Sequence, residues 1–494
     1  MSRELLNLDE DGEWAGEWWL PDEPDYKVPG ILRYTSADGL KLTLIGLFED
    51  CISTQISPGV EAIHEEFRTW EVIHGAAEQR EITLFGCIPN YSKRTYGARV
   101  QTPDKQTITS STALIGAHIS SKDEAVFSAV EVSVENLGVW GASSVIDFKG
   151  APGGRLNGSS TISVKPVEAQ SVKVDESEFI LAHHHTLPFF DQRRGRITGR
   201  VRDTTFIRVV PEASFSWSEA IDSARLVQDL IALATHRAAG VIWLRLRLVE
   251  SDAEAGATTL QDARNIEAIY SPPIVGNRDA KAIEPHRVFF TCKTLPFEEI
   301  IPRWCEVHER LQPALNMILG LRYGPARYIE NNLLTAVGAA EVLHRGLDID
   351  EPPMPREKFK QIREAIRAHV PEEHRERIMG SLRNDPTLRE RLCALAARPD
   401  SEAMSMLLPD VDRWAQQTTR ARNYLAHEGR TSKHSFEELI AIVDVTTAVV
   451  ILNLLHEVGL SAEQQRKILI EHPQLRATVR RAKKYLSVSE GSHD

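Results

Sequence analysis

The residue types best suited to chemistry stand together in one short segment, Arg422 to His427, which reads RNYLAH. A histidine side chain titrates near neutral pH, so it can give and take a proton under working conditions. An arginine side chain offers a fixed fork of donors that fits phosphate oxygens. The segment therefore suits chemistry on a phosphate, provided that Arg422 and His427 converge on the same group.

A single helix is expected to position this segment, with Asp410 as its N-cap and Gly429 as the residue that ends it. Arg422 and His427 lie about 140° apart around such a helix. They meet on one phosphate only by a long reach of the arginine, by unwinding of the helix end, or by use of a second chain, so a composite site is favoured. The expected apolar stripe is Val411, Trp414, Thr418, Ala421 and Leu425, and the polar face is Gln416, Arg420, Asn423 and His427.

The segment after this helix, from His434 to Gly459, is apolar almost all round in its second half. Such a helix is buried on every side, either in a helical bundle or in the interface of a helical dimer. The motif helix is therefore expected to end beside a hydrophobic seam.

Spacing alone does not identify the site, because similar spacings occur elsewhere in the chain. What distinguishes Arg422 is the adjacent Asn423 and its place at a helix end, whereas Arg303 precedes Trp304, which is expected in the core. The alternative for RNYLAH is a solvated helix end with an arginine salt bridge. The competing matches are Arg303/His308, Arg68/His74 and Arg466/His472.

The composition predicts a folded protein of two or three domains in a reducing compartment. At 494 residues the chain exceeds what one hydrophobic core supports. The first residues are acidic and lack the apolar run of a signal peptide, and the stretch from Ala448 to Leu455 is too short to cross a membrane. We therefore expect a cytoplasmic protein without a membrane anchor. Free thiols are favoured for its scattered cysteines, which are Cys51, Cys87, Cys292, Cys305 and Cys393.

The charge is distributed unevenly along the chain. A net charge of -12 argues at first against nucleic acid, because phosphate binding draws on clustered Lys and Arg. Residues 301–494, however, hold 28 Lys and Arg against 27 Asp and Glu, which leaves a net charge of -13 on residues 1–300. The acidity therefore belongs to the N-terminal part.

Hydrophobic periodicity predicts an α+β multidomain protein, with a β-rich, mainly antiparallel N-terminal region and an all-α helical-bundle domain after it. Short alternating pieces broken by Gly, Pro and Asp begin at Val28, with a hairpin turn at Ala37 to Gly39. A helix at Trp217 to Ala239 and a strand VIWLRLRLV follow, and helical periods dominate after Lys293. The expected domains are residues 1–295, either whole or divided into a sheet (1–212) and a mixed lobe (213–295), and a helical domain over residues 296–494.

Other features each have a functional and a structural interpretation. The run His183-His184-His185 could ligate a metal, but neighbours on a strand point to opposite faces and no carboxylate spacing accompanies it, so a polar strand edge or loop is favoured. Trp14, Trp18 and Trp19 form either an exposed recognition patch or part of a core, and core packing is typical. We expect no metal site.

The segment from Arg476 to Tyr485 gathers five basic residues, which either guide RNA phosphates toward the site or form a solvated helix face. The residues considered for RNA binding are Arg480, Arg481, Lys483 and Lys484. The sequence contains no Walker loop, no GxGxxG and no GxSxG motif, so no motif supports ATP binding, NAD binding or a serine-hydrolase function.

The segment RNYLAH, followed by a buried helix, resembles the R-N-x-x-x-H signature of HEPN ribonucleases. The upstream RYIENNLLTAVGAAEVLHR resembles the first long helix of the ApeA-type HEPN domain, and GEWWLPDEPDYKVPGILRYTSADGLKLTLIGLF resembles the start of the ApeA N-terminal domain. Many HEPN toxins paired with nucleotidyltransferase antitoxins carry a tyrosine two residues past the histidine. Here that residue is Gly429, so control by tyrosine modification is not supported.

The resemblance implies metal-independent, cofactor-free RNA cleavage at the interface of two HEPN domains, in anti-phage defence by abortive infection. The ribose 2′-OH would attack the adjacent phosphate, with His427 as general acid and base and Arg422 stabilising charge on the phosphate oxygens. Asn423 would orient His427 or the ribose. Glu341 and Arg420 are weaker, supporting candidates. The implied partners are RNA, with transfer RNA a reasonable substrate, a second copy of the chain, and a phage-derived trigger.

A second hypothesis is a non-catalytic adaptor, in which the helical domain dimerises and the β-rich region binds a polypeptide or a glycan. Mutation of His427 separates the two hypotheses, because an adaptor tolerates the loss of one polar side chain at a helix end. Under the leading hypothesis, the acidic N-terminal part helps to keep the effector silent until a trigger acts.

Overall fold

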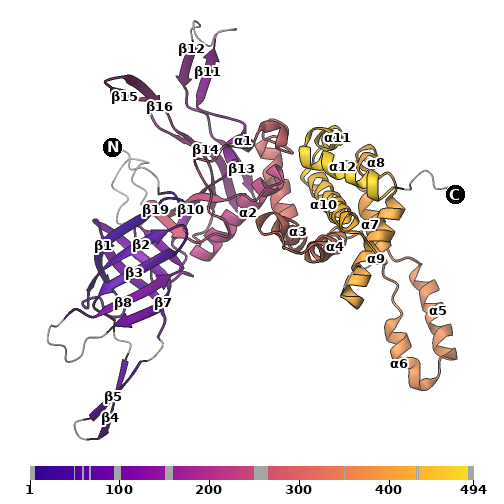
Figure 1. Ribbon diagram of the computed structural model, residues 1–494, viewed down its shortest axis with the longest axis horizontal. Coiled ribbons are helices and arrows are strands. Elements are labelled where there is room, and N and C mark those ends of the chain that lie inside the picture. The colour runs from indigo at the N-terminus through magenta and orange to yellow at the C-terminus, as the bar shows by residue number, and fades with distance from the viewer. Residues whose placement is uncertain are drawn as a thin grey trace. The chain divides into compact units, whose positions relative to one another are not determined.

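The computed structural model describes residues 6–48, 51–57, 60–65, 68–93, 102–150, 160–249, 265–349, 351–429, 431 and 433–487. The chain divides into two compact units (Figure 1). The β-rich unit consists of Met1–Ala232, Ala238–Ile283 and Thr291–Pro302, and the helical unit consists of Leu233–Arg237, Glu284–Phe290 and Arg303–Asp494.

One 13-stranded sheet forms the β-rich unit, and the pairings between its strands are antiparallel, as the alternating sequence predicts. In hydrogen-bonded order its strands are β13 (Gln170–Val174), β14 (Ser177–His185), β17 (Asp203–Pro211), β10 (Phe127–Val134), β18 (Val241–Leu248), β19 (Asn265–Tyr270), β9 (Thr112–Ile115), β7 (Arg80–Lys93), β6 (Trp70–Ala77), β1 (Gly12–Trp19), β2 (Val28–Thr35), β3 (Gly39–Ile45) and β8 (Lys105–Ser110). The predicted hairpin turn between β2 and β3 is confirmed, with Gly39 at a φ of 71°.

The long strand β7 closes part of this sheet on itself. It pairs with β6 and, further along, with β8, so that β7, β6, β1, β2, β3 and β8 form a barrel (Figure 1). Side chains alternate between its interior and solvent, as the period of a strand requires. Trp14, Trp18 and Trp19 are all buried, so the core interpretation of these aromatics is confirmed.

Three two-stranded hairpins complete the strands that are described. They are β4 (Cys51–Ser57) with β5 (Val60–Glu65), β11 (Ile146–Gly150) with β12 (Ser160–Val164), and β15 (Phe189–Arg193) with β16 (Arg196–Arg200). The predicted helix after residue 216 is α2 (Trp217–Thr235), and the short α1 is Leu137–Gly141.

The strands β18 and β19 lie inside the large sheet, between β10 and β9. A mixed lobe over residues 213–295, packed against the sheet, is one subdivision that the sequence allows, and the strands of this range are hydrogen-bonded into the same sheet as those before residue 212. Local periodicity identifies a strand and not its partner, so the sequence does not predict these pairings.

The helical unit contains ten described helices, of which the first, α3, begins within the residues assigned to the β-rich unit. They are α3 (Phe297–Tyr323), α4 (Ile329–Gly346), α5 (Arg356–His369), α6 (Glu372–Ser381), α7 (Leu388–Ala396), α8 (Ser401–Leu407), α9 (Val411–Glu428), α10 (Phe436–Val458), α11 (Ala462–Glu471) and α12 (Pro473–Tyr485), and a 3₁₀ turn lies at Pro285–Arg287. The predicted all-α C-terminal region is confirmed.

The helix α10 is the centre of this unit. It packs against α4, α7, α9, α11 and α12, and most of its residues are buried. Among the described helices it alone is long and apolar enough to cross a membrane, and 83% of its most apolar window is buried. The two alternatives for this segment were a bundle and a dimer interface, and α10 is buried within the bundle of one chain.

Two short segments from before residue 291 belong to the helical unit. His236 and Phe289 pack against His472, at ring-centroid distances of 5.8 and 4.9 Å. All three rings are nearly inaccessible to solvent. The helical unit is therefore completed by residues that precede its first long helix.

Within the described residues, Cys87, Cys292 and Cys393 form no disulfide. The side chain of Cys51 lies outside the described part of the chain.

Candidate functional site

The helix α9 carries the RNYLAH segment, and its ends are those that the sequence predicts. The Asp410 side chain accepts a hydrogen bond of 2.9 Å from the backbone N–H of Arg413. At the other end Gly429 adopts a left-handed conformation, with a φ of 68°, and its N–H donates to the Leu425 carbonyl. This conformation is open to glycine at little cost, so Gly429 fixes where the helix stops.

The apolar face of α9 fixes the rotation of the helix. Trp414, Thr418 and Ala421 are buried, and the indole N–H of Trp414 donates to Thr446 of α10 at 3.3 Å. Because these positions face the bundle, the residues at Asn423 and His427 face outward and are exposed. The packing of α9 thus presents the motif at the surface of the helical unit.

Arg422 is held in place by two side chains. Its Nη1 donates to Asn423 Oδ1 at 3.3 Å, and its Nη2 lies 3.8 Å from Glu341 Oε2 on α4. Arg422 and Glu341 are both partly exposed. The structure therefore brings together three of the residues singled out in the sequence, from two helices far apart in the chain.

His427 lies on the last turn of α9 and is exposed, with no hydrogen bond or ion pair of its ring within the described residues. The helix is regular through Glu428, so unwinding of its end does not bring Arg422 and His427 together. Arg422 instead points its guanidinium at Asn423 and Glu341. Two of the three ways in which Arg422 and His427 could meet on one phosphate remain. Either the arginine side chain moves and reaches further, or a second chain supplies one of the two residues.

The loop after α9 adds residues that sequence reasoning missed. Lys433 Nζ donates to the Tyr424 hydroxyl at 2.6 Å and lies 4.6 Å from the centre of the Tyr424 ring. Burial lowers the pKa of His434, Glu438 opposes this, and Arg420 lowers that pKa further. Arg420 itself is exposed on α9. A Tyr–Lys pair brought together by a loop leaves no spacing signal that could have revealed it.

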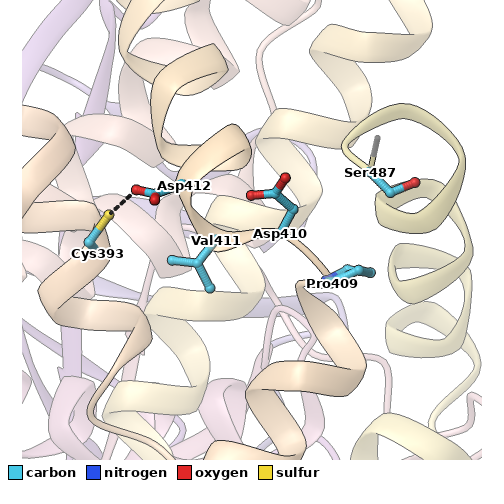
Figure 2. Close-up of a pocket in the computed structure, with 6 residues that line it drawn as sticks. All are labelled: Cys393, Pro409, Asp410, Val411, Asp412 and Ser487. Carbon is cyan, nitrogen blue, oxygen red and sulfur yellow. Dashed lines mark hydrogen bonds between the residues drawn. The ribbon is translucent and has the colours of Figure 1, made fainter. Parts of the chain in front are cut away.

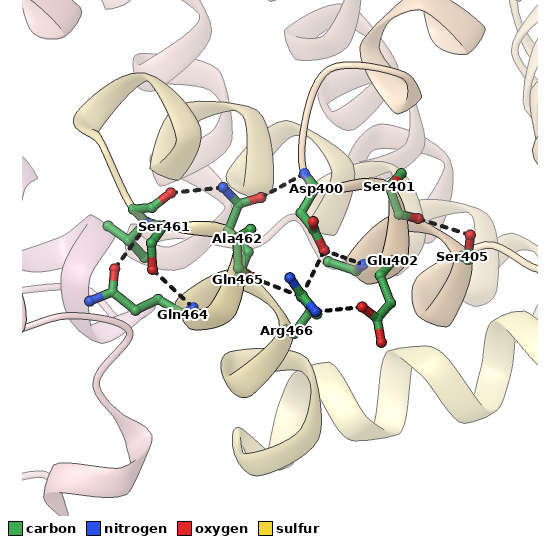
Figure 3. A network of polar contacts seen from close by, with 11 residues as sticks. Asp400, Ser401, Glu402, Ser405, Ser461, Ala462, Gln464, Gln465 and Arg466 are labelled. Carbon is green, nitrogen blue, oxygen red and sulfur yellow. Dashed lines mark hydrogen bonds and ion pairs between the residues drawn. The ribbon is translucent and has the colours of Figure 1, made fainter.

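The competing Arg and His pairs take part in packing. Trp304 is fully buried, as predicted, and His308 lies against it with ring centroids 5.4 Å apart. Arg466 joins α11 to α8 through Asp400, at 3.1 Å, and Glu402 (Figure 3). The ring of His74 stacks on that of His118 at 4.6 Å.

The histidine run lies on β14, where consecutive side chains point to opposite faces as expected. His183 Nδ1 lies 2.8 Å from Asp203 Oδ1 and its Nε2 lies 2.9 Å from Ser143 Oγ, while His184 Nε2 lies 3.5 Å from Glu131 Oε2. In the part of the chain that the structure describes, no group of three or more His, Cys, Asp or Glu side chains is arranged to hold a metal ion.

The basic residues of α12 lie beside α10. Arg480, Arg481 and Lys484 line a groove of about 310 Å³, together with Glu437 and Ile440 of α10. Arg481 also pairs with Asp444 of α10, whose pKa is raised by burial. The fourth residue considered in the sequence, Lys483, is exposed and is not among those lining the groove.

A larger pocket of about 630 Å³ lies at the N-terminal end of α9, lined by Pro409, Asp410 and Cys393 among others (Figure 2). Asp410 and His427 are separated by roughly 25 Å along the helix. Burial, and after it Asp412, raises the pKa of the Cys393 thiol, which therefore lacks the character of a reactive thiolate. Because this pocket is distant from His427 and its thiol is not activated, we do not take it as the candidate site.

Comparison with protein families agrees with the two units. The model for ApeA N-terminal domain 1 matches residues 13–304, and the model for Apea-like HEPN matches residues 334–464, which include α9 and Glu341. No curated protein and no solved structure matches the chain. The chain belongs to the ApeA family, with an ApeA N-terminal domain followed by an Apea-like HEPN domain.

Proposed function

We propose that this chain is a metal-independent HEPN endoribonuclease that acts in the cytoplasm in anti-phage defence by abortive infection. The observation that carries the proposal is the constellation at the exposed end of α9, where Arg422 is held by Asn423 and Glu341 while the His427 ring faces solvent. The match to Apea-like HEPN over residues 334–464 supports it. RNA is the proposed substrate, with transfer RNA one candidate.

The site divides the chemistry among its side chains. His427 takes the proton of a ribose 2′-OH and gives a proton to the departing 5′ oxygen, while the 2′ oxygen attacks the adjacent phosphorus. Arg422 stabilises the negative charge that develops on the phosphate oxygens. Glu341 and Asn423 fix the guanidinium in advance, and the exposed Asn423 can also meet the ribose. The products are a 2′,3′-cyclic phosphate and a 5′-hydroxyl.

A second copy of the chain supplies what one copy lacks. The side chains of Arg422 and His427 leave α9 about 140° apart, and the helix stays regular to Glu428. Two HEPN domains that face each other would place an arginine from one chain near a histidine from the other. We therefore propose a homodimer, or a higher even oligomer, as the active form.

The groove beside α12 is the proposed path for the RNA strand. Arg480 and Lys484 are exposed and line it, and clustered cations of this kind bind phosphates without regard to sequence. The groove lies at the N-terminal end of α10, which is the end that follows α9 in the chain.

We further propose that residues 1–295 sense a phage-derived trigger and restrain the effector in residues 296–494. Their net acidity disfavours RNA near the site until the trigger acts. Growth arrest by the full chain can be compared with that by residues 284–494, which retain Phe289, using His427→Ala in both as the control. Equal toxicity would contradict restraint.

The test of the ribonuclease is cleavage of total cellular RNA in EDTA by the purified full chain. Wild type and His374→Ala, a change at an exposed histidine of α6, are expected to cleave and leave cyclic-phosphate ends. His427→Ala is expected to remain folded and to lose cleavage. Cleavage by all three proteins would remove His427 from the mechanism, and cleavage by none, even with its trigger, would favour the adaptor hypothesis.

A further inference from the structure

A cluster of arginines on the large sheet of the β-rich unit takes no part in the proposed ribonuclease. Glu131 of β10 stands directly opposite Arg208 of β17 and opposite Arg245 of β18. Arg247 lies two residues further along β18, so its side chain shares the same face. We call Arg208, Arg245 and Arg247 the arginine cluster.

The arginine cluster surrounds one fully buried carboxylate. Glu131 Oε1 accepts hydrogen bonds from Arg208 at 2.8 Å and from Arg247 at 2.9 Å, and Arg245 Nη1 lies 3.8 Å from Oε2. The Glu131 side chain is 0% exposed. Burial alone would raise the pKa of Glu131, but His184, Arg208 and Arg247 outweigh it and lower that pKa to about 2.

The positive charge of the cluster exceeds the negative charge that faces it. Three guanidiniums meet the single charge of Glu131, and the nearby Glu267 is already held by Arg80 at 2.8 Å. Burial lowers the pKa of Arg245, against the pull of Glu131 and Glu267, and repulsion by Arg247 and Arg208 adds to the lowering. The three guanidiniums share one carboxylate, so the group of four side chains carries two positive charges in excess.

Two donors and one acceptor of the cluster lack hydrogen bonds. The Nε atoms of Arg245 and Arg247 are buried and donate no hydrogen bond within the described residues, and the buried Glu131 Oε2 accepts none there. A buried N–H without an acceptor is costly, and more so on a charged group. The side chains of Arg208, Arg245 and Arg247 are 22%, 16% and 28% exposed, so the cluster is reached from solvent.

Aromatic rings hold the arginines in position. The guanidinium of Arg208 lies 5.6 Å from the centre of the Phe206 ring, and that of Arg245 lies 5.9 Å from the centre of the Trp243 ring. Phe206 and Trp243 are each 1% exposed, so they support the arginines and present no surface for stacking on a base. His184, stacked on Phe206 at 4.2 Å, adds an imidazole beside Glu131.

We propose that the arginine cluster is a binding site for a phosphate group in the β-rich unit. A doubly charged tetrahedral oxyanion supplies both the missing charge and the acceptors for planar guanidinium donors. Recognition is of the phosphate itself, free or as the end of a phosphate monoester, because the buried aromatics cannot read a base. The site is separate from the HEPN motif and does not rest on the proposed ribonuclease.

The test is equilibrium dialysis of the full chain with radioactive inorganic phosphate, at constant ionic strength set with chloride. Wild type is expected to bind saturably, and Arg247→Gln should weaken binding roughly tenfold or more, because a charge-assisted hydrogen bond is lost. Arg33→Gln is the matched control: Arg33 lies in the same sheet but is exposed and paired with Glu13. It should bind like wild type.

A second variant is expected to change the affinity for phosphate in the opposite direction. Glu131→Gln removes the carboxylate that repels an incoming anion, so phosphate should bind more tightly and raise the unfolding temperature more than in wild type. A competition arm with 5′-AMP separates free phosphate from a monoester, since a monoester site binds AMP at least as tightly. No saturable binding by wild type, or equal binding by Arg247→Gln and Arg33→Gln, would overturn the proposal.

Discussion

The replacement Glu131→Gln tests whether the arginine cluster is organised by one carboxylate. Folding lowers the pKa of Glu131 from an ordinary value of 4.5 to about 2. At about 1.4 kcal/mol per pKa unit, this corresponds to about 3 kcal/mol of folding free energy. Removing one partner of a buried ion pair costs about 3–5 kcal/mol, which agrees in size.

The pH dependence of this contribution has a definite sign. A carboxylate with a lowered folded-state pKa stabilises the protein above pH 4.5, and the stabilisation is lost as pH falls toward 2. The difference between wild type and Glu131→Gln should therefore be about 3 kcal/mol at pH 7 and should shrink steadily below pH 4.5.

Urea unfolding in chloride salts, without phosphate or sulfate, measures this difference. Seven of the nine tryptophans lie in the β-rich unit, so fluorescence reports mainly on the unit that contains Glu131. The matched control is Glu13→Gln, whose exposed pair with Arg33 should contribute less than about 1 kcal/mol. A loss at Glu131 no larger than that at Glu13, or one that does not change with pH, would refute the reasoning.

Three further changes test the packing. In Gly75→Ala the new Cβ would lie 2.3 Å from the buried Trp18 ring, so the β-rich unit should lose about 1–3 kcal/mol in urea unfolding, and an unchanged midpoint would contradict this. Burial is the main cause that lowers the pKa of His472 to about 4; the neutral ring therefore contributes stability above pH 6.5 that is lost toward pH 4, and His472→Gln should flatten the fall in melting temperature over that range. An unaltered slope would count against a buried neutral His472. Phe289→Ala should cost about 3–5 kcal/mol in the helical unit, measured by its unfolding in urea, because the ring is 3% exposed; a loss below about 1 kcal/mol would show that Phe289 does not complete this unit.

Local signals in the sequence predicted much of the secondary structure. The helix α9 follows from its capping Asp410, its apolar stripe and Gly429, each of which acts within a few residues. The strand β18 follows from the alternation in VIWLRLRL. These elements were predictable because their causes are local.

The pairing of strands was not predictable in the same way. The sheet joins β19 to β9 although about 150 residues separate them, and barrel closure depends on one strand, β7, that reaches both β6 and β8. Alternation shows that β18 has a polar face, but not that Arg245 and Arg247 cover a carboxylate from β10. Such contacts depend on partners distant in sequence, which periodicity does not identify.

In the candidate site, too, the residues of one helix could be predicted from the sequence, whereas contacts between distant segments could not. Arg422, Asn423 and His427 could be named from one helix, and Glu341 was a weaker candidate whose approach to Arg422 depends on how α4 packs beside α9. The Tyr424–Lys433 pair depends on the path of the loop after α9, and no pattern in the sequence predicts it. The 140° between Arg422 and His427 was calculable from the start and is the reason for proposing a second chain.

The most direct test of that central proposal is RNA cleavage in EDTA by a heterodimer of Arg422→Ala and His427→Ala chains, co-expressed with different tags and purified as the mixed species. The composite site predicts that each variant homodimer is inactive, while the heterodimer, which keeps one intact arginine and one intact histidine, recovers cleavage with cyclic-phosphate ends. A heterodimer as inactive as both homodimers, beside an active wild type, would contradict a site shared between two chains.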